Sequence, residues 1–203
     1  MNRLIATLLI TSSFLVFCHC GGVPPTYFYR VDYEMEAPNP HNNDIIPITL
    51  GIAPFTADHL FENDKIVYRY SPYEVQFYHY RRWVAPPKKI VAETVHKHYR
   101  ASGVFKRVVN LPSTFKIDYI LKGRILAFEE WDESQAWFGI VTLEFQLHNS
   151  ANNEIVWEKT ITEKTPAASK APVGVVQAIS ESLNVVVKKS IEEIRTVLKT
   201  NNI

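Results

Sequence analysis

The chain has 203 residues, of which 46% are hydrophobic and 21% are charged, which suits one folded domain with its tails. This balance excludes disorder over most of the chain. The formal net charge is only +1, whereas binding to nucleic acid needs a clustered basic excess. The composition therefore predicts a folded domain that binds no nucleic acid.

The N-terminus has the order of charge and hydrophobicity that is typical of a secretory signal. Arg3 is the only charged residue before an apolar stretch over residues 4–17. That stretch is shorter than the roughly 20 residues that span a bilayer comfortably. The alternative is a buried first strand or helix, but nothing else in the chain requires an apolar partner at this end. We therefore predict a signal peptide over residues 1–20 and an exported protein.

Both cysteines of the chain, Cys18 and Cys20, lie where the apolar stretch ends. No cysteine follows them, so the domain has no disulfide framework, and a bridge across one intervening residue would close a strained ring. Their position indicates lipid attachment at a signal cleavage site, on either Cys18 or Cys20. As in bacterial lipoproteins, a leucine, Leu15, lies three residues before Cys18, and two glycines follow Cys20. The alternative is ordinary cleavage of the signal with no lipid.

Residues 21–44 hold four prolines and end in the turn-forming sequence HNND, which predicts an extended tether with one short strand at 27–33. The folded domain is expected over residues 45–203. It begins with a strand at 45–55, followed by two strands around the turn at Ser71-Pro72. We place these two strands at 66–70 and 75–80.

A helix is predicted over residues 86–102. Pro86 and Pro87 stand where it would begin and Gly103 where it would end. Between them, apolar residues repeat every four positions, as in an amphipathic helix, at Val91, Val95 and Tyr99. A short strand at 104–109 is expected next.

Three alternating strands follow, at residues 115–127, 137–147 and 155–163, and their short loops predict an antiparallel meander. Gly123 interrupts the buried row of the first strand and is the expected place of a bulge. After Pro172, apolar residues recur at helical spacing to Leu198. This predicts a C-terminal helix about 40 Å long that can cross a whole sheet face.

The sequence carries no motif of the common catalytic or metal sites. It has no phosphate-binding loop of an ATPase, no second apolar run of a permease, and neither HExxH nor GxSxG. His96 and His98 lie two residues apart on the predicted helix and point about 200° apart, so they cannot share a metal ion. We therefore predict no catalytic residue, no metal and no cofactor.

An acidic cluster surrounds Trp131 at a predicted hairpin tip, formed by Glu129, Glu130, Asp132 and Glu133. Paired carboxylates can perform acid–base chemistry when a pocket separates their pKa values. A hairpin tip rarely provides such a pocket. We expect a solvated loop with partner contact as its functional option, and a periplasmic hydrolase is the enzymatic alternative.

The segment DKIVYRYSPYEV at residues 64–75 continues to YRRW at 80–83 and to Pro86-Pro87. It resembles the ABC-type transport auxiliary lipoprotein family (PqiC-like), whose pattern runs from a tyrosine-rich segment after the cysteine to a long C-terminal helix. The resemblance covers nearly the whole mature chain. It implies an α/β fold, a three-layer sandwich with a mixed sheet, similar to anticodon-binding-like and TolB N-terminal domains.

The resemblance also implies a role. Family members are non-enzymatic periplasmic subunits of MCE-type ABC systems that transport phospholipid or organic solvent, and they dock or align the transport conduit. The implied partners are an MCE-domain protein and the ABC permease and ATPase complex. The implied location is the periplasm, with a lipid anchor in a membrane, which we expect to be the outer membrane. The alternative is a periplasmic lipid-binding shuttle.

Seven aromatic residues lie within residues 68–83, more than one sheet face can hide, because alternate residues of a strand point to opposite faces. We assign Tyr68 and Phe77 to the core, with Trp83 as a further core candidate. Tyr, Trp and Arg are enriched at binding hot spots. We therefore expect a partner-binding surface, for self-association into a homo-oligomer or for docking, at Tyr73, Glu74, Tyr80, Arg81 and Trp83.

Overall fold

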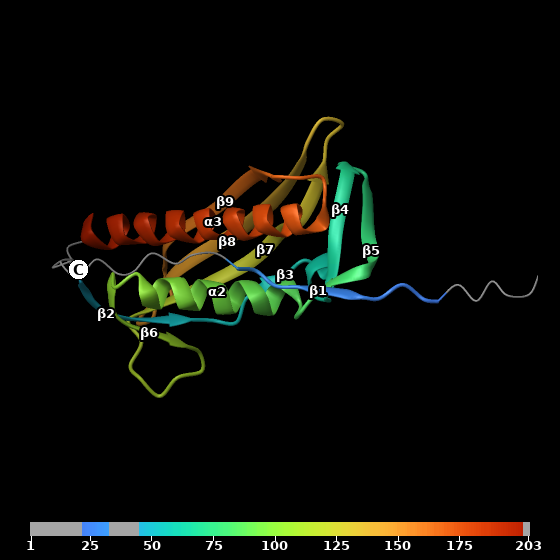
Figure 1. The fold of residues 1–203 in the computed structure, drawn as a ribbon. Helices are drawn as coiled ribbons and strands as arrows, with labels where there is room; N and C mark the ends of the chain where they lie inside the picture. Colours follow the sequence, from blue (N-terminus) through green and yellow to red (C-terminus); the bar gives the residue numbers. More distant parts are fainter. Residues whose placement is uncertain (1–21, 33–44, 201–203) are drawn as a thin grey trace, which may run out of the picture.

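The computed structural model describes residues 22–32 and 45–200. The predicted signal peptide at 1–20, with Cys18 and Cys20, and residues 33–44 of the predicted tether lie outside the described residues. Strands, two α-helices and a short 3-10 helix follow one another along the described chain (Figure 1). In order they are β1 (Tyr27–Tyr29), β2 (Ile46–Ile52), β3 (Thr56–Ala57), η1 (His59–Phe61), β4 (Lys65–Ser71), β5 (Glu74–Trp83), α2 (Pro87–Ala101), β6 (Phe105–Asn110), β7 (Tyr119–Asp132), β8 (Trp137–Asn149), β9 (Ile155–Pro166) and α3 (Pro172–Thr200).

Strand β7 is the centre of one nine-stranded mixed sheet. Along one edge it pairs antiparallel with β8, which pairs antiparallel with β9. Its other edge is shared end to end by β2, β3 and β4, all parallel to it. The predicted meander and mixed sheet are confirmed. Because β4 pairs only with Glu129, Glu130 and Trp131 of β7, the β4–β5 hairpin is attached at one end of the central strand.

The two helices lie side by side, with α3 across β8 and β9 and α2 against β6 (Figure 1). They meet where the buried Tyr99 hydroxyl lies 2.8 Å from the Ser190 hydroxyl. The backbone of α3 lies directly on Gly139 of β8. The predicted long C-terminal helix is confirmed, and its 29 residues span about 44 Å.

Both helices cover the same face of the sheet (Figure 1). On that face β8 buries Val141, Leu143, Phe145 and Leu147, while the alternating side chains Thr142, Glu144 and Gln146 stay partly exposed. The predicted α/β class is confirmed. The family resemblance implies a three-layer sandwich with a mixed sheet. The described part of the chain shows the mixed sheet with one layer of helices on it.

Helix α2 begins and ends as its sequence predicts. Pro86 is the N-cap and Pro87 the first helical residue, a position where the missing N–H of proline costs nothing. At the other end Gly103 follows the C-cap and has a φ of 64°, a left-handed conformation that glycine adopts without strain. The stripe of Val91, Val95 and Tyr99 is fully buried.

The first strand of the meander differs from the prediction. It runs over Tyr119–Asp132, and Phe115, the expected first residue, is half exposed. The irregularity in its pairing with β8 falls between Ile125 and Ala127. Gly123 instead makes room for the ring of Phe55, which a Cβ at that position would overlap. Alternation along one strand could not reveal this contact, because Phe55 comes from a distant part of the chain.

Candidate functional site

Two consecutive carboxyl groups, Glu129 and Glu130, lie in β7 where the β4–β5 hairpin joins the sheet. They are only 2% and 0% exposed, so the prediction of a solvated tip is wrong for both. The strand continues past them to Asp132, and the turn to β8 comes only after that residue. Because β4 pairs with one edge of this segment and β8 with the other, both residues are enclosed.

Glu129 is held by Arg69 of β4. The Arg69 Nε donates to Glu129 Oε1 at 2.9 Å, and Nη2 of the same guanidinium donates to the same oxygen. Burial raises the pKa of Glu129, and the contacts from Arg69 oppose that rise. The guanidinium also lies 5.9 Å from the ring centre of Trp131. This contact between a partly exposed guanidinium and a buried carboxyl group fixes β4 to the central strand.

Glu130 meets Tyr78 of β5. The Tyr78 hydroxyl lies 3.0 Å from each carboxyl oxygen of Glu130 and donates to this group. Burial, followed by the neighbouring Asp132, raises the pKa of Glu130 to about 8. Burial and the Glu130 carboxyl also raise the pKa of Tyr78. At neutral pH Glu130 is therefore mostly protonated, and an uncharged pair joins β5 to β7.

A carboxyl group with a raised pKa beside a second acid is also what a general acid requires. The Glu130 side chain, however, has no exposed surface. The rings of Tyr68 and Tyr78 pack on each other within the same hairpin, with centres 4.8 Å apart. A solute reaches Glu130 only if the hairpin moves away from the sheet. The geometry therefore favours a structural role, in which the carboxyl groups hold the hairpin in place.

The far end of the hairpin carries two of the predicted partner-binding residues. Tyr73 is 95% exposed in the turn between β4 and β5. Glu74 beside it is exposed, and its Oε1 accepts a hydrogen bond of 3.0 Å from the Tyr70 hydroxyl. Figure 1 shows this turn standing away from the helices. We call Tyr70, Tyr73 and Glu74 the hairpin tip.

The remaining predicted partner-binding residues lie near the other end of β5. Tyr80 is exposed and Arg81 is half-buried. Trp83 is 1% exposed and packs on Phe128, with ring centres 5.1 Å apart, so the expectation that it contacts a partner is wrong. Glu74 and Arg81 are seven residues apart on one strand, which corresponds to about 23 Å. The single surface expected from the sequence is therefore two separate surfaces.

The neighbours of this second surface were not predicted from the sequence. Strand β1 pairs with β5 so that Tyr27 lies beside Arg81 and Phe28 beside Arg82. Tyr27 is 56% and Phe28 62% exposed, and Val84 is exposed next to them. The aromatic sequence at 27–29 was the available signal for this surface, but by itself it indicated only a short strand in a tether. We call Tyr27, Phe28, Tyr80 and Val84 the β1 edge.

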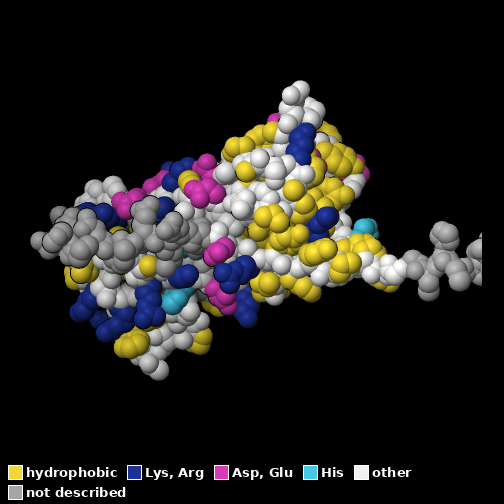
Figure 2. All heavy atoms as spheres, in the orientation of Figure 1, with side chains coloured by type: hydrophobic (Ala, Val, Ile, Leu, Met, Phe, Trp, Pro, Cys, Tyr) yellow, Lys and Arg dark blue, Asp and Glu magenta, His cyan; other side chains and the backbone are white. Residues whose placement is uncertain are grey.

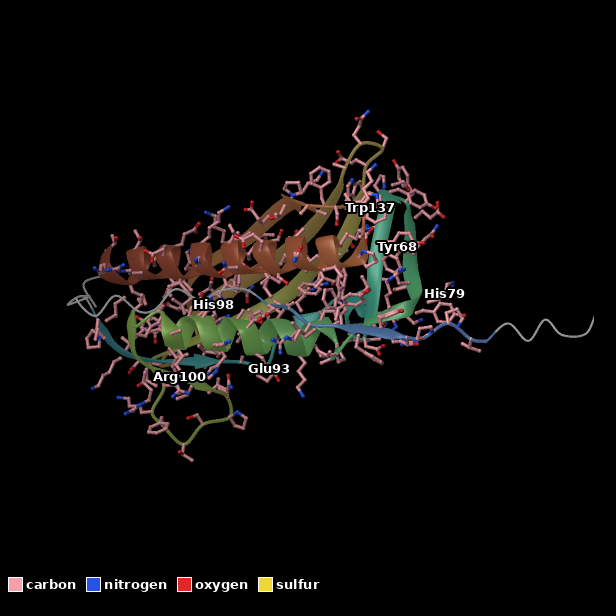
Figure 3. All side chains as sticks on the ribbon, viewed as in Figure 1. Tyr68, His79, Glu93, His98, Arg100 and Trp137 are labelled. Atoms are coloured by element: carbon pink, nitrogen blue, oxygen red, sulfur yellow. The ribbon has the colours of Figure 1, made fainter. Side chains whose placement is uncertain are left out.

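The surface view shows hydrophobic side chains gathered at the end of the molecule that holds β1 and the β4–β5 hairpin (Figure 2). His79 of β5 lies at the outer side of this end, away from the helices, whereas Trp137 and Tyr68 lie nearer to α3 (Figure 3). Within residues 22–32 and 45–200 no group of three or more His, Cys, Asp or Glu side chains could hold a metal ion.

A family model described as the ABC-type transport auxiliary lipoprotein component matches residues 32–189. The chain belongs to this family. The match includes every strand from β2 to β9 and most of α3, so the resemblance seen in the sequence is confirmed. Membership places the chain among lipoproteins that accompany ABC-type transport. Neither helix of the described chain is both long enough and apolar enough to cross a membrane.

Solved structures share this architecture. Protein XCC0632 from Xanthomonas campestris is 21% identical, with a TM-score of 0.76 over 87% of this chain and 99% of that chain. An uncharacterized protein is 10% identical, with a TM-score of 0.66 over 84% and 99%. The hypothetical protein CT253 from Chlamydia trachomatis is 6% identical, with a TM-score of 0.51 over 75% and 98%. At these identities the likeness shows the fold alone. A sequence search of curated proteins found no significant match.

Proposed function

We propose that this family member is a non-enzymatic, lipid-anchored periplasmic subunit of an MCE-type ABC system that transports phospholipid or organic solvent. Its task is to dock or align the transport conduit through the hairpin tip. One observation carries the proposal. Two contacts to buried carboxyl groups, from Arg69 to Glu129 and from Tyr78 to Glu130, hold the β4–β5 hairpin to the sheet, while its tip is open to solvent.

A hairpin held in this way is suited to docking. A contact surface that is already rigid loses less conformational entropy on binding than a flexible loop does. Tyr73 and Tyr70 supply large side chains with a polar end, the type of residue that is enriched at binding hot spots. The partner in this proposal is the MCE-domain protein that forms the conduit, together with its ABC permease and ATPase.

The lipid anchor places this hairpin at a membrane. We propose attachment at Cys18 or Cys20, and stable anchoring requires two or more acyl chains. Neither cysteine is followed by Asp, a residue that often retains lipoproteins at the inner membrane. The proposed location is therefore the periplasmic side of the outer membrane, facing the conduit.

The shuttle alternative needs an apolar cavity that holds a lipid. A groove of about 690 Å³ lies beside β2 and the start of β7. Its lining is mixed: Lys116, Asp118, Asn149 and Ser150 are polar, whereas the larger, apolar share comes from residues such as Pro47, Ile48 and Ile117. The shuttle alternative would use this groove, whereas the docking proposal does not depend on it. Native mass spectrometry that detects one phospholipid per chain would instead support the shuttle.

Co-purification from solubilised membranes tests the docking role. The double variant Tyr73→Ala, Glu74→Ala should lose the MCE-domain protein while its melting temperature stays within about 2 °C of the wild type. Phe115→Ala, which removes an exposed aromatic side chain from the loop before β7, is the matched control and should retain the partner. Normal recovery of the partner with the double variant would show that the tip is not the docking site.

The hydrolase alternative makes the opposite prediction about the acidic cluster. If Glu130 or Asp132 performed acid–base chemistry, Glu130→Gln or Asp132→Asn would abolish function in a folded protein. The docking proposal expects a small functional effect from either change. Complete loss of function at an unchanged melting temperature would favour the enzyme.

A further inference from the structure

We propose that the β1 edge is a membrane-contact surface, which seats in the headgroup region of the anionic phospholipid membrane that holds the lipid anchor. This inference rests on the anchoring part of the proposed function and adds a second contact between the protein and the bilayer. The domain would then be held at a defined orientation and would not swing freely on its tether. Three independent observations support it.

The first observation is the exposure of aromatic side chains on both faces of an edge strand. β1 ends the sheet, and its outer edge has no strand partner in the described part of the chain. Tyr27 and Phe28 are consecutive and point to opposite faces, yet each is more than half exposed. Tyr80 and Val84 extend this surface, and Figure 2 shows the hydrophobic side chains of this end reaching the point where the chain leaves the domain. Aromatic side chains with apolar neighbours are typical of residues at a membrane–water interface.

The second observation is the length of chain between this surface and the anchor. Tyr27 lies seven residues after Cys20 and nine after Cys18. Even a fully extended chain of that length reaches only about 25 to 32 Å. This reach is shorter than the domain itself, because helix α3 alone is about 44 Å long. In Figure 1 the described N-terminal segment leaves the domain at the β1 end, away from the C-terminal end of α3. A lipid on either cysteine therefore keeps the β1 edge close to the bilayer.

The third observation is the charge beside the β1 edge. Four cationic side chains lie at this end, Arg30, Lys65, Arg81 and Arg82, and the acidic ones near them are Asp32, Asp64 and, beside Arg30 and Val84, Glu93. Asp32 pairs with Arg30, Asp64 with Arg82 and Glu93 with Lys89. Lys65 and Arg81 instead lie on aromatic rings, 5.0 Å from the centre of Phe77 and 5.2 Å from that of Tyr78. Cationic side chains beside aromatic rings favour a surface of anionic headgroups.

A second copy of the chain is a weaker candidate for the same surface. Pairing through β1 would add a ladder of only three residues. Pro24 and Pro25 precede it, and proline cannot donate a backbone hydrogen bond to a neighbouring strand. A bilayer needs no such ladder, because the hydrated headgroup region satisfies the exposed backbone groups.

Fluorescence quenching in vesicles tests the contact. The full lipidated protein is purified, its lipid is verified by intact mass, and it is placed in vesicles of phosphatidylethanolamine with a minority of phosphatidylglycerol. Phe28→Trp is compared with Ile155→Trp, an exposed position at the start of β9. Brominated acyl chains should quench the fluorescence added by Phe28→Trp about twofold, because interfacial side chains lie about 5–10 Å deep. The fluorescence added by Ile155→Trp should not change.

Each other outcome overturns the inference in a distinguishable way. A lipidated protein whose Phe28→Trp signal is not quenched would retain its anchor but lack the membrane contact. If the intact mass shows no attached lipid, the protein has no lipid anchor, and this inference fails together with the proposed anchoring. Protection of Phe28→Trp from a soluble quencher, in detergent as well as in vesicles and without bromine quenching, would assign the surface to a second copy of the chain.

Discussion

The Tyr78 hydroxyl on β5 reaches the Glu130 carboxyl on β7 at 3.0 Å, across the intervening strand β4. Strands two apart in a sheet lie about 9.5 Å from each other, so only two long side chains can make such a contact. It ties the outer strand of the hairpin directly to the centre of the sheet. The raised pKa of Glu130 makes this contact dependent on pH.

We expect the protein to become less stable as the pH rises through the range in which Glu130 titrates. The pKa of Glu130 is about 8 in the folded chain against an ordinary value of 4.5, so between these values the native state binds more protons than the unfolded state. The free energy of unfolding then falls as the pH rises between the two pKa values. Above the folded pKa, the stabilisation that comes from protonated Glu130 is lost. The melting temperature should be lower at about pH 9 than at about pH 6.

Glu130→Gln isolates this effect, because an amide keeps the shape of the protonated carboxyl group but does not titrate. The difference in melting temperature between the two pH values should shrink in this variant. Glu181→Gln, on the exposed side of α3, is the control and should behave like the wild type. Equal pH dependence in wild type and Glu130→Gln would contradict the assignment.

Arg69→Ala should be strongly destabilising, because it leaves the Glu129 carboxyl buried without its cation. Breaking a buried pair in this way costs about 3–5 kcal/mol of unfolding free energy, measured by chemical denaturation. Adding Glu129→Gln to Arg69→Ala should recover much of the loss. Lys89→Ala removes a surface pair with Glu93, whose atoms are 3.9 Å apart, and should change stability by less than about 0.5 kcal/mol. A small effect of Arg69→Ala would argue against a fixed hairpin.

Gly139→Ala should weaken the packing of α3 on the sheet. A Cβ at this position would lie 2.5 Å from the carbonyl carbon of Ala178 and 2.8 Å from the Cα of Ile179, and helix backbone cannot turn aside as a side chain can. We expect a loss of about 3 kcal/mol, at the upper end of the usual cost of overpacking. Gly22→Ala, where no atom lies within 4 Å of the added carbon, should be neutral. A neutral Gly139→Ala would mean that α3 can shift away from β8.

Membrane attachment should depend on the two cysteines. The double variant Cys18→Ser, Cys20→Ser lacks any thiol for acylation, so it should be released from membranes by a high-salt wash that leaves the wild type bound. The single variants then identify which cysteine carries the lipid. Retention of the double variant after the wash would rule out the lipid anchor.

The sequence by itself determined the local elements and the family. Pro87 and Gly103 mark the two ends of helix α2, because each has a backbone preference that acts at its own position. The alternation in β8 and the helical spacing in α3 predicted the meander and the long helix, since such periods are set by neighbouring residues. The pattern from Asp64 to Pro87 was sufficient to indicate the family.

Only the tertiary structure decided which of the patterned residues are buried. Glu129 and Glu130 have the composition of a solvated turn, but β4 and β8 enclose them, and β4 comes from some 60 residues earlier in the chain. Trp83 faces Phe128 in the core. Tyr27 and Phe28 stay exposed because β1 is an edge strand of the sheet. Burial depends on which distant strand pairs at each edge, and the spacing of residues within one segment carries no information about that pairing.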